Sequence, residues 1–142
     1  MIYASWFDRP LSIAGRITKN TPAGITSELI NIDQNLCLIP NVAIHMQREQ
    51  NDGKKVNPQI DTLPLISTNG KQLADIIDMR DVLAADLYLY NRDKGFLFGA
   101  DQELIGAPRL DDLQCVFAAL QGFLHAETSA SIPVFCAFDS EE

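Results

Sequence analysis

The stretch Leu11-Ser12-Ile13-Ala14-Gly15-Arg16-Ile17-Thr18 decides how the first part of the chain folds. Its apolar and more polar positions alternate, which predicts a β-strand with one buried face. Thr21-Pro22-Ala23-Gly24 follows as a turn signal, so residues 25–33 can return as the second strand of a hairpin. Another strand is predicted over residues 85–90. The first part of the chain is therefore predicted to be rich in β-structure.

Shorter elements are predicted between these strands. Residues 36–39 form a short apolar run that Pro40 closes, and Asn41 can cap a short helix that carries His45. Residues 63–66 read as a possible edge strand because Pro64 interrupts them. Residues 71–79 have helical character.

Beyond Gly99 the pattern changes to a loop, a helix and a buried strand, which is one βα unit of a larger sheet. Asp111 and Asp112 open the predicted amphipathic helix at its electropositive end. Residues 132–138 are predicted to form a buried, parallel strand. Its apolar run ends at an acidic tail that contains Glu141 and Glu142.

The carboxylates of Asp111, Glu141 and Glu142 have two interpretations. Ligands of open α/β sheets bind outside the carboxyl ends of the strands, so these groups could hold a divalent metal. The alternative is a helix cap at one end and a solvated tail at the other, and spacing alone favours this second interpretation.

Composition excludes several functional classes. The net charge of -8 and the pI near 4.6 argue against binding to nucleic acid, which requires clustered Lys and Arg. No apolar run approaches the roughly 20 residues of a membrane span. Three widely spaced cysteines in apolar stretches are typical of buried, reduced thiols in a cytoplasmic protein. They are Cys37, Cys115 and Cys136.

Several motifs together resemble one family. Trp6-Phe7-Asp8-Arg9-Pro10-Leu11-Ser12-Ile13-Ala14-Gly15-Arg16 resembles a "WFDRDLxLAGR" segment, and Ile39-Pro40-Asn41-Val42-Ala43-Ile44-His45-Met46-Gln47-Arg48 resembles "IPxLAIHLxR". Residues 86–90, 101–105 and 107–113, followed by the acidic tail, match further blocks in the same order. The chain resembles the aspartyl aminopeptidases, a family of two-metal exopeptidases. It departs from their pattern at Pro10, Ala100 and Asp112.

The resemblance implies a role for each candidate residue. Asp111 would bridge two zinc ions, and Glu142 would ligate one of them. Glu141 would be the general base that takes a proton from the attacking water. His45 would reach the active site of a neighbouring subunit and help to bind the substrate or its tetrahedral intermediate. The implied substrates are peptides with acidic N-terminal residues.

The resemblance also implies an α+β architecture. Residues 1–97 would be a β-rich, barrel-like dimerisation domain, and residues 98–142 a helix and strand from an α/β catalytic domain. The family forms homo-oligomers that build from dimers up to dodecamers. It also uses metal ligands beyond the segments matched here, so the isolated chain is expected to be inactive. The alternative is an oligomerisation domain with no chemistry of its own.

Overall fold

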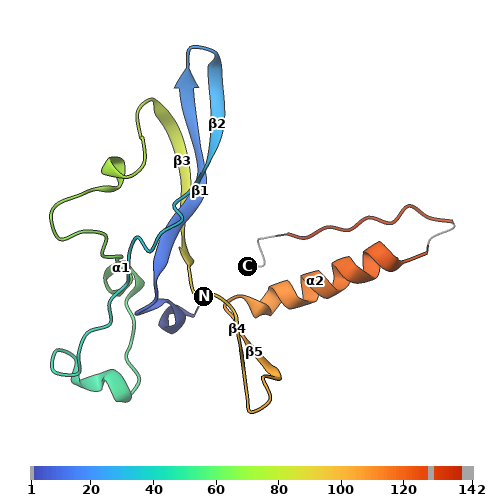
Figure 1. The fold of residues 1–142 in the computed structure, drawn as a ribbon. Helices are drawn as coiled ribbons and strands as arrows, with labels where there is room; N and C mark the ends of the chain where they lie inside the picture. The colour runs from blue at the N-terminus through green and yellow to red at the C-terminus, as the bar shows by residue number, and fades with distance from the viewer. Residues whose placement is uncertain (1, 128–129, 139–142) are drawn as a thin grey trace. The chain divides into compact units, whose positions relative to one another are not determined.

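A computed structural model describes residues 2–127 and 130–138 (Figure 1). The chain divides into two compact units, Met1–Asp93 and Lys94–Glu142. The sequence predicted a boundary after residue 97. The roles predicted for the two parts, a dimerisation domain and a catalytic-domain fragment, stay predictions.

The first unit is organised by a three-stranded antiparallel sheet with strand order β2-β1-β3 (Figure 1). Its central strand is β1 (Leu11–Thr21), which pairs with β2 (Gly24–Asn31) and with β3 (Val82–Asn91). The predicted hairpin and the third strand are therefore confirmed. The alternation in β1 has the predicted cause, since one set of its side chains is buried. That set is Leu11, Ile13 and Ile17; Ser12 of the other set is also buried, and its hydroxyl donates to the carbonyl of Ile32.

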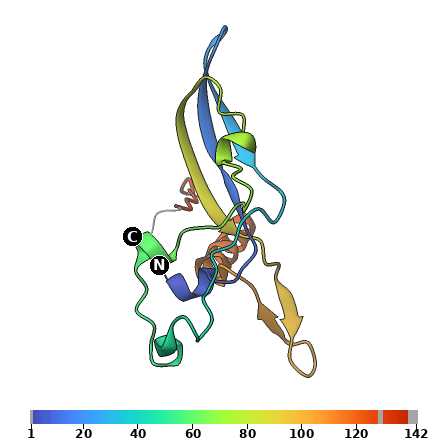
Figure 2. The same cartoon turned by 90° about the vertical axis from the view of Figure 1, so that its left-hand side faces the viewer.

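The core of the first unit lies on one face of the sheet. Ile13 and Ile17 pack with Ile77, which belongs to the segment that leads into β3 and contains the 3-10 turn η3 (Leu73–Asp75). Figure 2 shows this segment beside the strands. A second cluster joins Phe7, Leu11, Cys37 and Ile39 near the 3-10 turn η1 (Tyr3–Trp6). Both clusters bury side chains from outside the sheet against β1.

Some local predictions for this unit are wrong. His45 lies in a turn, not on a helix, and the 3-10 turn η2 (Arg48–Asn51) follows it. Residues 71–79 contain only η3, and the predicted edge strand near Leu65 is reduced to one bridge with Leu38. The remaining helix of the unit is the single turn α1 (Pro58–Asp61). Helices as short as these segments are marginal in water, so their contacts with the rest of the unit decide their conformation.

The predicted α+β class is confirmed, but within residues 2–127 and 130–138 the sheets do not close into a barrel. β2 and β3 each pair with β1 alone, so both have an unpaired edge. Closing a barrel requires the two edge strands to pair with each other or with further strands.

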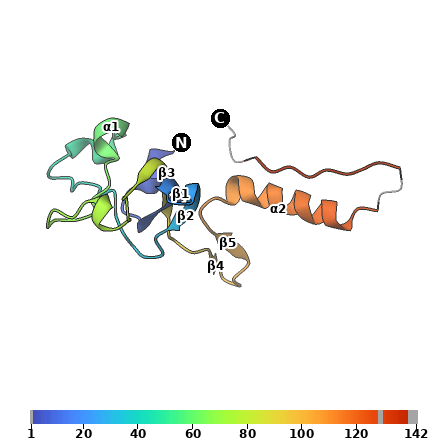
Figure 3. The ribbon, with the colours of Figure 1, turned by 90° about the horizontal axis from the view of Figure 1, so that it is seen from above.

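The second unit contains an unpredicted hairpin and a predicted helix. β4 (Phe96–Phe98) pairs with β5 (Leu104–Gly106), and α2 (Leu110–His125) follows. Sequence reasoning missed the hairpin because strands of three residues leave too short a pattern to recognise. Figure 3 shows α2 and the extended segment that comes after it. That segment contacts the helix where the rings of Phe123 and Phe135 lie 5.9 Å apart.

Residues 132–138 do not form the predicted buried strand. They have no regular secondary structure, and Ile132 and Phe138 are 91% and 86% exposed. A parallel strand requires neighbouring strands for its backbone hydrogen bonds. The described part of this unit offers only the short β4–β5 hairpin, so the apolar run is left extended and uncovered.

The exposure of the cysteines differs between the two units. Cys37 is buried as predicted, and its burial raises the pKa of the thiol. Cys115 and Cys136 are exposed, which contradicts the prediction for them, because the surfaces that would cover α2 and residues 132–138 are not supplied by the described chain. None of the helices described here has the length and apolar character needed to cross a bilayer.

Candidate functional site

The segment that carries His45 is anchored at its base by the Trp-Phe-Asp-Arg motif. Phe7 forms a bridge with Ile39, and the backbone N–H of Asp8 donates to the carbonyl of Ile39 over 2.9 Å. The Asp8 carboxylate accepts from the backbone N–H of Asn41, also over 2.9 Å. Asp8 has a φ of 57°, a left-handed conformation that Asp and Asn tolerate better than most residues. This residue therefore turns the chain and fixes the start of the His45 segment.

The far end of the segment is closed by side-chain contacts. The Gln50 amide donates to the side chain of Asn41 and to the carbonyl of Val42, each over 2.8 Å. The Lys54 ammonium donates to the same Asn41 oxygen over 3.3 Å and lies 4.9 Å from the centre of the Phe7 ring. The predicted helix cap at Asn41 is thus replaced by a clamp that holds both ends of a projecting loop.

His45 lies at the tip of this loop and is exposed. Its neighbours Ile44 and Met46 are 49% and 80% exposed, so the tip presents apolar side chains around an imidazole. Such a group can donate or accept a hydrogen bond near neutral pH. The loop tip therefore has the chemistry of a contact surface for another molecule.

Arg9 and Arg92 hold the surrounding strands. Arg9 forms an ion pair with Asp93 at 3.1 Å, whereas the carboxylate of the adjacent Asp8 accepts from Asn41. The Arg92 guanidinium donates to Asp33 over 2.8 Å, and this hydrogen bond raises the pKa of Arg92. The backbone N–H of Arg92 also donates to the carbonyl of Pro10 over 2.9 Å. These contacts connect the end of β3 to the chain that leads toward the loop.

Asp111 lies at the start of α2, in the second unit. Arg109 precedes it with a φ of 65°, and Asp111 itself has an extended backbone with φ -83° and ψ 116°. The peptide bond between Asp111 and Asp112 is cis. Both aspartates are exposed, and Arg109 forms no ion pair with either of them. Two exposed carboxylates therefore lie at the electropositive end of the helix, and the position of both aspartates at its start agrees with the sequence prediction.

The described residues do not complete a metal site. Carboxylate oxygens such as those of Asp111 are accepted zinc ligands, but zinc takes three or four protein ligands. Within residues 2–127 and 130–138, no group of three His, Cys, Asp or Glu side chains gathers closely enough to hold a metal ion. The predicted partners Glu141 and Glu142 lie outside the described residues. Asp111 fits zinc by its chemistry, and among the described residues it is the one member of the predicted ligand set.

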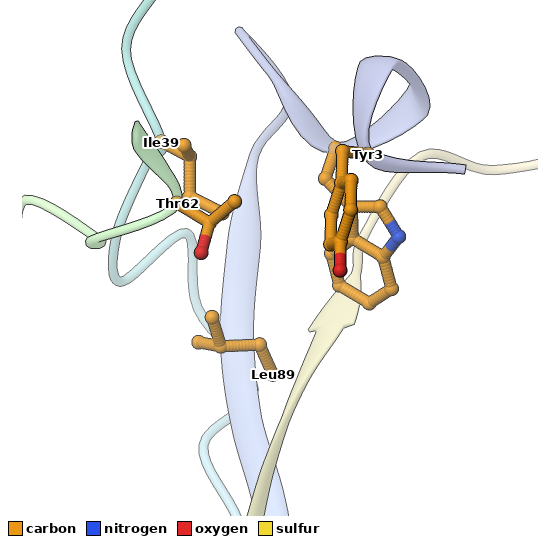
Figure 4. A pocket seen from close by; sticks show the side chains of 5 residues that line it. Tyr3, Ile39, Thr62 and Leu89 are labelled. Carbon is orange, nitrogen blue, oxygen red and sulfur yellow. The ribbon is translucent and has the colours of Figure 1, made fainter. Parts of the chain in front are cut away.

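A cavity that sequence reasoning missed lies in the first unit. Its volume is about 200 Å³, and its lining is mainly apolar. Figure 4 shows Tyr3 facing Ile39 and Thr62 across the space, with Leu89 at one end. Trp6 completes the lining. The cavity contains no carboxylate, imidazole or thiol, so it suits an apolar side chain and not a reaction.

Comparison with known proteins explains the motifs. The sequence model of the family described as "Aminopeptidase I zinc metalloprotease (M18)" matches residues 1–142. The probable M18 family aminopeptidase 2 of Clostridium acetobutylicum is 43% identical over 155 aligned residues, which cover 99% of this chain and 36% of that protein. The chain therefore spans little more than a third of the length of this curated relative.

Solved structures agree on the fold. One chain of an Ape4 and Nbr1 complex is 29% identical, with a TM-score of 0.69 over 85% of this chain and 29% of that one. The mApe1 dodecamer of S. cerevisiae is 23% identical, with a TM-score of 0.59 over 82% of this chain and 28% of that one, and at this identity the likeness concerns the fold alone. The resemblance read from the motifs is confirmed: this chain belongs to the M18 family of aminopeptidase I zinc metalloproteases.

Proposed function

We propose that this chain is part of a zinc aminopeptidase that removes acidic N-terminal residues from peptides. The observation that carries the proposal is the match of the M18 family over residues 1–142, with the motif residues in their expected order. Support also comes from the exposed carboxylates at the start of α2. The preference for acidic residues rests on the resemblance to the aspartyl aminopeptidases.

Asp111 and Glu142 would supply carboxylate ligands to two zinc ions. When bound, the ions lower the pKa of a water molecule and polarise the scissile carbonyl. Glu141 would accept the proton from the attacking water and pass it to the leaving amine. Asp112 adds a second negative charge beside Asp111, which favours cation binding at that end of α2.

His45 would act in the active site of a neighbouring subunit. The clamped loop supports this proposal, because it holds an exposed imidazole away from the sheet of its own unit. A histidine can donate a hydrogen bond to the oxyanion of a tetrahedral intermediate. The role requires a homo-oligomer, for which the dodecamer known for mApe1 is a precedent. We place the protein in the cytoplasm on the basis of its reduced cysteines.

A variant of the proposed base tests this function. In a longer M18 protein that contains this chain, Glu141→Gln should lower kcat for an aspartyl or glutamyl anilide by about 10²–10⁴-fold, the usual contribution of a general base. The zinc content should stay unchanged, because glutamine removes the base and not a ligand. Glu127→Gln, at an exposed position of the same unit, is the matched control and should keep full activity. Loss of zinc in Glu141→Gln would contradict the assigned roles.

The isolated 142-residue chain should not hydrolyse these anilides, even with added Zn²⁺. Turnover that disappears in Glu141→Gln would overturn this expectation. The second candidate function is an oligomerisation domain without chemistry, and the exposed sheet face of the first unit favours it for the isolated chain. Sedimentation of the inactive chain distinguishes an assembling domain from an inert one.

A further inference from the structure

The sheet of the first unit has one covered face and one open face. On the first face, Ile13 and Ile17 of β1 are buried against Ile77, which lies in the segment that leads into β3. The opposite face consists of the alternate residues of the three strands, and we call it the outer face. Ser12 is buried at one end of this face, and the rows from Ala14 onward are open. Leu29 of β2 and Tyr88 of β3 project from it with 84% and 67% exposure. Large apolar side chains are thus left in solvent on this face.

Each row of the outer face pairs side chains of complementary character. Arg16 of β1 lies in register with Asp86 of β3, and their charged groups are 3.8 Å apart. Their side chains remain 60% and 65% exposed, so each can meet another charge. The next row places the small Ala14 beside the large Tyr88. One row is complementary in charge and the other in size.

We propose that a second copy of this chain docks on the outer face, about a two-fold axis that runs along the strands midway between β1 and β3. This rests on the homo-oligomer of the proposed function and names the surface that builds it. Such an axis exchanges the two strands. Arg16 then meets the partner's Asp86, and Asp86 meets the partner's Arg16. Tyr88 covers the partner's Ala14 in the same way. Each row is therefore complementary to the same row of the partner.

The Arg16–Asp86 pair favours a second copy as the occupant, because the pair is complementary to itself. The chain carries a net charge of -8, so two copies repel each other over most surfaces. The central pair of the outer face is neutral and reciprocal, which removes that repulsion where the copies meet. Strand spacing and rise give the face roughly 15 Å by 20 Å, smaller than a standard interface. We therefore expect this face alone to give a weak dimer, which should be detectable at protein concentrations of up to about 200 µM.

Two charge reversals and their mixture test the proposal. Arg16→Asp makes two pairs of carboxylates face each other across the axis, and Asp86→Arg makes two pairs of guanidinium groups do so. Each variant alone should dimerise at least about tenfold more weakly than the wild type. An equimolar mixture should recover the wild-type affinity, because every contact across the axis again joins opposite charges. Sedimentation velocity measures all three samples.

The mixture separates contacts between copies from contacts within one copy. Each variant keeps its like-charged pair within its own sheet, so recovery on mixing can only come from the partner. An exposed ion pair contributes little to folding, and circular dichroism checks that both variants are folded. Arg80→Asp is the matched control, since it reverses the same charge in the exposed Arg80–Asp78 pair outside the sheet. It should dimerise like the wild type.

The remaining outcomes separate the proposed docking surface from the homo-oligomer on which it rests. If the wild type dimerises and neither reversal weakens it, the outer face is not the interface, although the homo-oligomer stands. Failure of the mixture to recover affinity overturns the two-fold arrangement. A wild type that is monomeric at about 200 µM overturns the docking surface itself. The peptidase assay on Glu141→Gln is independent of all these results.

Discussion

Replacing Gly15 with alanine tests how closely β1 and β3 approach each other. Gly15 lies opposite Leu87 in the register of the two strands. A Cβ at this position would overlap the carbonyl oxygen of Asp86 and would lie 2.9 Å from the Cα of Leu87. Ordinary van der Waals contacts of a Cβ begin at 3.4 Å. Because both obstructing groups are backbone, a rotamer change cannot relieve the overlap, and β3 must move away from β1.

The expected loss of stability follows from these contacts. Overpacking a core position costs about 1–3 kcal/mol. Moving β3 also weakens the ladder hydrogen bonds on either side of Leu87, at about 1 kcal/mol for each bond. Gly15→Ala should therefore lower the free energy of unfolding by about 3–5 kcal/mol. A domain of this kind has only about 5–15 kcal/mol in total, so a loss of this size shifts its unfolding in urea by a measurable amount.

Fluorescence gives a local readout for this change. Trp6 is the single tryptophan of the chain, and it packs against the core cluster of the first unit. Equilibrium unfolding in urea, followed through Trp6, should show a lower midpoint for Gly15→Ala. Gly122→Ala is the control, because a Cβ there meets open space on α2. It should leave the Trp6 transition unchanged. A Gly15→Ala midpoint equal to that of the wild type would refute the close approach of the two strands.

Two further predictions concern the thiols and the His45 loop. A thiol reagent should label two cysteines quickly and Cys37 slowly, and intact-mass spectrometry counts them; fast labelling of all three would contradict the burial of Cys37. Because the pKa of Cys37 is raised in the folded state, the free energy of unfolding should be unaffected by this thiol at neutral pH and should fall as the pH rises above about 8.5. Asp8→Ala removes the acceptor for Asn41 and strains a left-handed residue, so trypsin should cut after Arg48 several-fold faster. Asp8→Asn keeps both properties and should be cut at the wild-type rate.

Local patterns were enough to predict the main elements. The alternation around Ile13 and Ile17 reports a strand with one buried face, and a Pro-containing turn fixes its hairpin partner. Helical spacing after Asp112 likewise identified α2. These signals work because the side chains that create the pattern lie within one element. The β4–β5 hairpin and the turn at His45 depend on a few residues each and leave no such period.

Patterns fail where burial depends on distant chain. Residues 132–138 have the composition of a buried strand, yet Ile132 and Phe138 are exposed. Leu113 and Phe117 of α2 are exposed in the same way. Their apolar character indicates a covering surface, and the described residues do not supply it. Composition thus predicted which side chains favour burial but not what would cover them.

The candidate site shows the same limit, and it links catalysis to assembly. Family motifs, and not spacing, made Asp111 and His45 candidates, since spacing alone favoured a helix cap for Asp111. The two residues belong to different compact units, and metal ligation and substrate contact are separate tasks. Under the proposed function, an enzyme held as a monomer would keep the carboxylates of Asp111 and Glu142 but lack the neighbour's His45. Zinc binding would then survive dissociation, while the rate of peptide hydrolysis would fall with the fraction of assembled subunits.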